Sequence, residues 1–286
     1  MDMKTKGIIT YLAIAFGMAW ILWEIPMRRG IPSTAGMFQL MILPGAFAPA
    51  IACIVVRKWI TREGFSDAGL KLKVEGNLRY YFFAWLLPLP VVLAITGLAI
   101  LFGISEPDLS LQSVLGALPP GTELPFSSGV LLVLIVVQSM IMALIFTPVL
   151  WGEEFGWRSY LQIRLFSNRP VVAAVATGII WGVWHYPLNL RGYNFPEHPV
   201  LGLIVFPVST VFLSIILGWL RLKTESIWSA SLAHAATNTV GASLIILLFM
   251  GGGNFIYVGY LGILGWIPLG IVSAWIVLTG RLAPKG

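Results

Sequence analysis

The sequence predicts an all-α membrane protein, a bundle of about eight transmembrane helices with its N- and C-termini in the cytoplasm. Of the 286 residues, 58% are hydrophobic and only 10% are charged, and the mean hydropathy is +0.88. These values lie outside the range of soluble domains and within that of multi-span membrane proteins. The lengths of the apolar segments and the placement of the basic residues agree with this class.

Eight apolar segments approach the roughly 20 residues that a helix needs to cross a bilayer. The segments between them are polar or rich in Gly and Pro, and we find neither an internal repeat nor a separate soluble domain. We therefore expect one polytopic domain over 1–286. Its predicted spans are 7–23, 38–56, 80–103, 129–151, 170–187, 199–220, 227–249 and 256–279.

The basic residues fix the expected orientation. With a cytoplasmic N-terminus, fifteen of the eighteen Lys and Arg residues lie in cytoplasmic segments, from Lys4 to Lys285, and only Arg28, Arg29 and Arg191 lie outside. Such a bias is the one that the positive-inside rule describes. The net charge of +6 is then due to basic residues at the membrane surface, and the sequence has no nucleic-acid-binding motif.

Two adjacent acids follow the fourth span. Glu153 and Glu154 are flanked by aromatic residues, and Arg158 lies four residues after Glu154, where an ion pair on one helix face is natural. A solvated salt bridge at an interfacial helix end would explain the segment equally well. Ionisable groups within a bilayer are costly, however, and indicate a functional site.

Two of the three histidines also lie within apolar segments. Trp181 and His185 are one helical turn apart in the fifth span, and His234 and Asn238 have the same spacing in the seventh. Each pair alone could be structural, through hydrogen bonds between helices. Together with the acids, they could supply a carboxylate and an imidazole that activate a water molecule, and donors for an oxyanion.

These residues resemble the CPBP family, which comprises type II CAAX prenyl endopeptidases and the bacteriocin-processing or immunity (Abi) proteins. The run E-E-F-G-W-R (153–158) matches E-E-x-x-x-R, and His234 with Asn238 matches H-x-x-x-N. The second motif, F-x-x-x-H, matches at His185 but has Trp181 in place of Phe. The resemblance covers about 140–245, the expected catalytic core.

The resemblance implies an eight-helix intramembrane endopeptidase whose cavity opens to the cytosol and to lipid. By motif position, Glu153 and His185 would activate water, His234 and Asn238 would stabilise the oxyanion, and Glu154 with Arg158 would support them. The implied partners are the lipid bilayer and a lipidated or membrane-associated peptide, for instance a prenylated C-terminal tail.

The need for a metal stays open on sequence grounds. Glu153, His185 and His234 could form a zinc site with an open position for water, and the family is often described as metalloproteases. The same groups could also hold water directly, and no H-E-x-x-H spacing is present. We expect no cofactor, with zinc as the alternative.

Two other classes of function remain. Buried Glu, His and Asn residues could serve a proton- or cation-coupled transporter, although no inverted repeat supports it. A catalytically inactive scaffold of the same fold is the second alternative. The peptidase hypothesis requires Glu153, His185, His234 and Asn238 to surround one cavity. For that, the fourth helix must continue beyond residue 153, with the fifth starting later and reaching past Pro187, or the helices must tilt.

Overall fold

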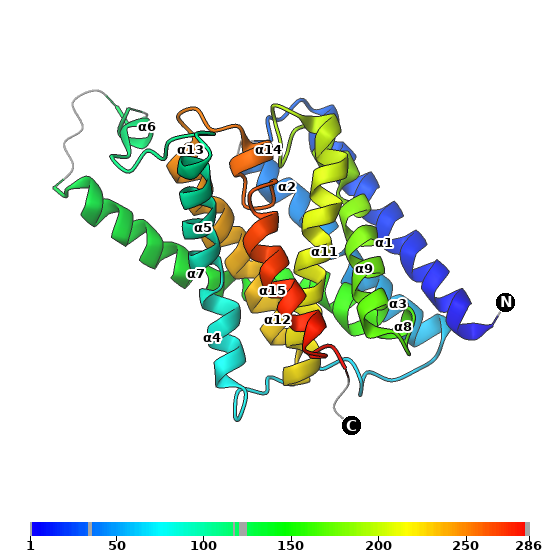
Figure 1. Ribbon diagram of the computed structural model, residues 1–286. Coiled ribbons are helices and arrows are strands. Elements are labelled where there is room, and N and C mark those ends of the chain that lie inside the picture. Colours follow the sequence, from blue (N-terminus) through cyan, green and yellow to red (C-terminus); the bar gives the residue numbers. More distant parts are fainter. Residues whose placement is uncertain (1, 34–35, 117, 120–124, 284–286) are drawn as a thin grey trace.

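The computed structural model describes residues 2–33, 36–116, 118–119 and 125–283, and these ranges contain helices and turns but no strand. Lys285, which is predicted to be cytoplasmic, lies outside these ranges. Within the described ranges, six helical segments are long and apolar enough to cross a membrane, and two further apolar helices are shorter. The all-α membrane fold is thereby confirmed (Figure 1).

The eight apolar segments follow the predicted order with different ends. The six long ones are Met3–Arg28 (α1), Gly36–Ile60, Leu78–Leu101, Ser128–Arg164, Pro199–Thr224 (α11) and Ile227–Phe249; the two shorter ones are Pro170–Trp184 (α9) and Trp266–Leu278 (α15). Proline or π-helical turns divide four of them. Gly36–Ile60 consists of α2 (Gly36–Ala46), α3 (Ala48–Val55) and the turn Val56–Ile60, and Leu78–Leu101 consists of α4 (Leu78–Leu86) and α5 (Pro88–Leu101). Ser128–Arg164 consists of α7 (Ser128–Gly156), the turn Trp157–Leu161 and α8 (Gln162–Arg164), and Ile227–Phe249 consists of α12 (Ile227–Ala236), the turn Thr237–Ala242 and α13 (Ser243–Phe249). Short helices α6 (Gln112–Leu115), α10 (Tyr186–Asn189) and α14 (Phe255–Val258) lie in the connections.

The last predicted span, 256–279, is interrupted. The chain forms α14, turns through a segment with Gly259, Gly262 and Gly265, and only then enters α15. Backbone oxygens lie within 3 Å of where a Cβ would stand at Gly259 and Gly262. The turn is therefore built for residues without side chains, and it shortens the final helix.

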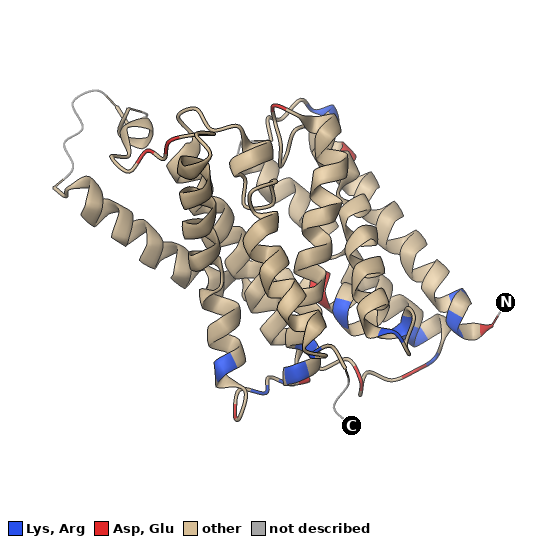
Figure 2. Ribbon diagram, in the orientation of Figure 1, with Lys and Arg blue, Asp and Glu red and all other residues tan. Residues whose placement is uncertain are grey.

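The exterior of the bundle suits a lipid environment. Large apolar side chains such as Leu93, Leu101 and Leu278 are 73%, 74% and 85% exposed. The start of α1, the first spanning helix, and the end of α15, the last one, lie at the same end of the bundle (Figure 1). Most of the Lys and Arg residues also gather at that end (Figure 2). This distribution is the one expected of a cytoplasmic face, so the predicted orientation stands as a proposal.

Close contact between α9 and α11 positions the second motif. A Cβ at Gly178 would lie 2.6 Å from Cα of Val211, and one at Gly182 would lie 2.6 Å from Cα of Pro207. Thr210 Oγ1 also donates a hydrogen bond to the carbonyl oxygen of Gly178, at 2.9 Å. Glycines four residues apart let membrane helices approach closely, and here they hold Trp181 and His185 against the bundle.

An ionic cluster ties the loop after Ile60 to the bundle. Arg57, whose side chain is fully buried, donates to Asp67 Oδ1 at 2.7 Å and to the carbonyl oxygen of Ser159 at 3.0 Å. Arg164 pairs with Glu63 at 2.8 Å and with Asp67 at 3.3 Å. Burial alone would raise the pKa of Asp67, but the hydrogen bond and charge of Arg57 and the charge of Arg164 hold it below its ordinary value of 3.8.

We therefore expect Asp67→Asn to lower the thermal unfolding midpoint at neutral pH. A carboxyl group whose pKa is lowered by folding stabilises the protein above its unfolded pKa, and that stabilisation is lost as the pH falls through the folded value. The gap in Tm between the parent and the variant should accordingly close below about pH 4. Glu75→Gln, which neutralises an exposed carboxylate on the same loop, is the control. A gap that persists unchanged at acid pH would contradict the ion pairing.

Candidate active site

The acid pair lies inside the bundle because the fourth helix continues past it. The predicted end at residue 151 is wrong: the helical segment reaches Arg164, eleven residues beyond Glu153. Gly152 and Gly156 lie within this continued helix and allow close packing. Beside them the side chain of Phe47 and the backbone of Pro49 lie within 3 Å of where a Cβ would stand. Glu153 is consequently 6% exposed and Glu154 is fully buried.

Because the fourth helix is longer than predicted, Glu153 lies deep in the bundle and not at its surface. At 1.5 Å per residue, Glu153 lies about 16 Å from the end of its helical segment. His185 directly follows the last residue of α9, the helix that begins at Pro170 as predicted. The expected later start of this fifth helix is therefore wrong, and the continuation of the fourth is confirmed.

Trp181 joins the first motif to the second. Its indole Nε1 donates a hydrogen bond to Oε2 of Glu153 at 2.8 Å. The carbonyl oxygen of Trp181 accepts a hydrogen bond from Nδ1 of His185 at 2.9 Å. Because a carbonyl can only accept, Nδ1 of His185 carries the proton, and Nε2 of the neutral ring keeps a lone pair.

Glu154 joins the first motif to the third. Its Oε1 accepts from Nη1 of Arg158 at 3.2 Å and from Nδ1 of His234 at 2.9 Å. Arg158 is fully buried, and its guanidinium lies 4.3 Å from the centroid of the Trp181 ring. The His234 ring stands edge-on to the same indole, with centroids 5.1 Å apart. The predicted pair of Glu154 and Arg158 is thus present, with His234 as a further partner.

Aromatic rings enclose His185 on several sides. Its ring centroid lies 4.8 Å from that of Trp184, 4.9 Å from Phe206 and 6.0 Å from Trp23. The indoles are fixed in turn, since Trp184 donates to the carbonyl of Ala15 and Trp23 to that of Ile42, both at 2.9 Å. His185 is therefore held by α1 and α2 as well as by its own helix.

Asn238 is the predicted site residue that no hydrogen bond connects to the others. It is exposed, and its amide makes no hydrogen bond within the described ranges. Its helix changes from α to π geometry at Thr237, so the regular spacing from His234 does not continue. Single π-helical turns within α-helices often occur at functional sites.

Three of the candidate groups each use one polar atom for positioning and keep another free. Among the described residues, Oε1 of Glu153 and Nε2 of both His185 and His234 make no hydrogen bond with protein, and none of these atoms is fully buried. The structure therefore gathers Glu153, Glu154, Arg158, Trp181 and His234 directly, and adds His185 through Trp181.

Glu153, His185 and His234 are the residues of the possible zinc site. Across the described ranges, no three His, Cys, Asp or Glu side chains come together as a metal-binding group. One polar atom of each named residue, Glu153, His185 and His234, is bonded to the chain, and a second polar atom of each is free within these ranges. Because the three side chains are not gathered as a metal-binding group, the arrangement does not fit the proposed ligand set.

Tyr193 is a neighbour of the site that the motifs do not contain. Its hydroxyl donates to Oε1 of Gln39 on α2 at 2.8 Å. Burial, and next the charge of Glu153, raise the pKa of Tyr193 to about 12. It lies in an irregular segment after α10, where helical spacing offers no signal that could have identified it.

The segment that carries the candidate residues is similar to known proteins. Residues 131–240 match the family described as type II CAAX prenyl endopeptidase Rce1-like. This segment is similar to that family. The predicted family resemblance is thereby confirmed, and the matched segment contains all three motifs.

A curated relative extends the similarity beyond this domain. The chain is 28% identical over 242 residues to CAAX prenyl protease 2 of Methanococcus maripaludis, covering 80% of this chain and 81% of the relative. This alignment is more than twice as long as the segment that matches the Rce1-like family. The resemblance therefore extends beyond 140–245, the range that the motifs alone indicated.

Proposed function

We propose that this protein is an intramembrane endopeptidase that removes a C-terminal peptide from a membrane-associated, prenylated substrate. The observation that carries the proposal is that Trp181 contacts three of the candidate groups. Its indole donates to Glu153, its carbonyl oxygen accepts from His185, and its ring packs against the edge of His234. The similarity of residues 131–240 to the Rce1-like family and of the chain to CAAX prenyl protease 2 supports this class of substrate.

In this proposal Glu153 is the general base. Oε1 of Glu153 removes a proton from a water molecule while the water oxygen bonds to the scissile carbonyl carbon. Nε2 of His185, whose lone pair is free because Nδ1 holds the proton, accepts a hydrogen bond from the second hydrogen of that water. Glu153 then returns its proton to the departing amine as the C–N bond breaks. The carboxylic acid that remains passes its proton to the freed amine, so the products are a carboxylate and an ammonium terminus.

The third motif stabilises the tetrahedral intermediate. Glu154 accepts a hydrogen bond from Nδ1 of His234, which fixes the orientation of the ring, as a carboxylate does for a catalytic histidine. Nε2–H of His234 then donates to the oxyanion, and the exposed amide of Asn238 supplies a second donor. Arg158 balances the charge of Glu154 and stacks on Trp181.

Cleavage of a farnesylated CAAX peptide by the protein in nanodiscs tests the proposal. We expect mass spectrometry to show release of the residues after the lipidated cysteine, slower cleavage of the unprenylated peptide, and no effect of a chelator. No cleavage of either peptide, together with an ion flux that requires Glu153, would identify a transporter instead. Absence of both activities would indicate a scaffold.

A substitution at Trp181 tests how Glu153 is positioned. Trp181→Phe introduces the residue of the family motif and keeps an aromatic wall, but it removes the donor to Glu153. A hydrogen bond to a charged group contributes about 1.5–3 kcal/mol, so we expect kcat to fall by about 10- to 100-fold with little change in KM. Trp219→Phe is the matched control, because the buried Nε1 of Trp219 has no partner in the described chain. Equal rates for the two variants would contradict the assignment.

A further inference from the structure

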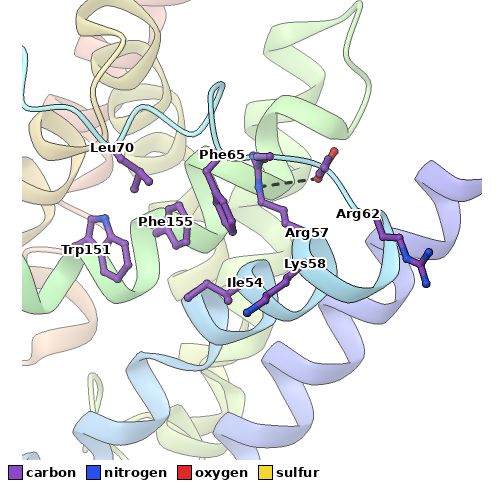
Figure 3. A pocket seen from close by; sticks show the side chains of 10 residues that line it. Ile54, Arg57, Lys58, Arg62, Phe65, Leu70, Trp151 and Phe155 are labelled. Atoms are coloured by element: carbon purple, nitrogen blue, oxygen red, sulfur yellow. Dashed lines mark hydrogen bonds and ion pairs between the residues drawn. The ribbon is translucent and has the colours of Figure 1, made fainter.

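A cavity of about 830 Å³ lies where α3, the turn Val56–Ile60 and the following loop meet α7 (Figure 3). Its wall is apolar and largely aromatic. Phe155 stacks between Trp151 and Phe65, with ring centroids 4.7 and 6.2 Å away. Ile54 and Leu70 extend this wall, and they are 37% and 40% exposed.

The cationic residues at the edge of the cavity have no carboxylate partner. Lys58 extends beside Ile54, and Arg62 lies at the outer end with its guanidinium turned outward (Figure 3). Neither forms an ion pair within the described ranges. Glu63, the acid that lines the cavity, is engaged by Arg164 at 2.8 Å. The charge that remains uncompensated is therefore positive.

This cavity is separate from the candidate active site, although both lie on α7. Trp151 and Phe155 are one turn apart, and Glu153 points about 160–200° around the helix from either of them. None of the candidate catalytic residues lines the cavity. A peptide bond held there would be on the wrong side of α7 for Glu153, which argues against substrate as the occupant.

We propose that the cavity binds one anionic phospholipid. Its acyl chain lies along the wall formed by Trp151, Phe155 and Phe65. Its phosphate lies at the edge of the cavity against Lys58, with the Arg62 guanidinium rotated inward to meet it. Basic pockets beside transmembrane helices attract anionic headgroups. The turn Val56–Ile60 and the loop after it, which line the cavity, lie at the end of the bundle where basic residues gather (Figure 2). A neutral lipid would leave both cations unpaired, whereas free phosphate would leave the aromatic wall uncovered. The bound lipid steadies α7, and this proposal holds whether or not the protein cleaves peptides.

Native mass spectrometry of the delipidated full chain tests this site. The probes are phosphatidylglycerol, phosphatidylcholine, farnesol and inorganic phosphate. We expect one tightly retained phosphatidylglycerol, with phosphatidylcholine at least about tenfold weaker. In Lys58→Gln/Arg62→Gln the preference should fall by about tenfold or more, because two charges near the phosphate are lost. Lys71→Gln/Arg79→Gln removes two exposed charges from the same side of the bundle, outside the cavity, and should bind like the parent.

Four results would overturn the proposal. Equal retention of both phospholipids, or an equal loss in the two double variants, would show that Lys58 and Arg62 do not select the headgroup. Displacement of phosphatidylglycerol by farnesol, irrespective of the charge variants, would identify an isoprenoid site. Displacement by inorganic phosphate alone would identify a simple anion site. A thermal unfolding scan of each variant shows whether a loss of binding reflects a loss of fold.

Discussion

Glu153→Gln is expected to reduce peptide cleavage by about 10²- to 10⁴-fold, the usual contribution of a general base. Gln keeps the size of the side chain, and its carbonyl oxygen can still accept the hydrogen bond that Trp181 Nε1 donates to Glu153 at 2.8 Å. The variant should therefore fold normally but be unable to take a proton from water. Cleavage of the farnesylated peptide and a thermal unfolding scan measure the two properties separately.

The matched control for this prediction is a carboxylate on the surface. Glu75→Gln removes the same charge from an exposed loop and should cleave at the parent rate. Full activity in Glu153→Gln would eliminate Glu153 as the base, and the proposed reaction with it. A loss of activity accompanied by a large fall in Tm would show that Glu153 acts on the fold instead.

Arg158→Met is expected to destabilise the protein by about 3–5 kcal/mol, because it leaves a buried carboxylate without its cation. Arg158 and Glu154 both have 0% side-chain exposure and are 3.2 Å apart. The free energy of unfolding in mixed micelles measures the effect. Glu154→Met/Arg158→Met, which removes both charges, should recover much of the lost stability.

An exposed pair of the same geometry is the control. Arg28 and Glu24 are also four residues apart at 3.2 Å, but their side chains are 80% and 33% exposed. Solvated pairs of this kind contribute at most about 1 kcal/mol, so Arg28→Met should have little effect. Similar losses in Arg28→Met and Arg158→Met would mean that burial does not determine the cost. A double variant at 154 and 158 that is no more stable than Arg158→Met would place the loss elsewhere, in the contact with Trp181.

The sequence by itself determined the membrane class, the order of the apolar segments and the identity of the motif residues. Hydropathy is a local property, and a span such as Pro199–Thr224 requires about the same number of apolar residues whatever its neighbours are. The ion pair of Glu154 and Arg158 was likewise predictable, because helical geometry alone brings residues four apart together.

Only the tertiary structure decided where the fourth helix ends and which groups meet. Gly152 and Gly156 allow Phe47 and Pro49 to approach, and nothing near them in the sequence distinguishes a packing glycine from a helix end. The bonds from Trp181 to Glu153 and from His234 to Glu154 span 28 and 80 residues. Such pairings depend on how α7, α9 and α12 pack, and a π-helical turn at Thr237 interrupts the regular spacing that predicted Asn238 beside His234. Helical periodicity is set within a few residues of chain, whereas an active site is formed by contacts between helices, and these exist only once the bundle has packed.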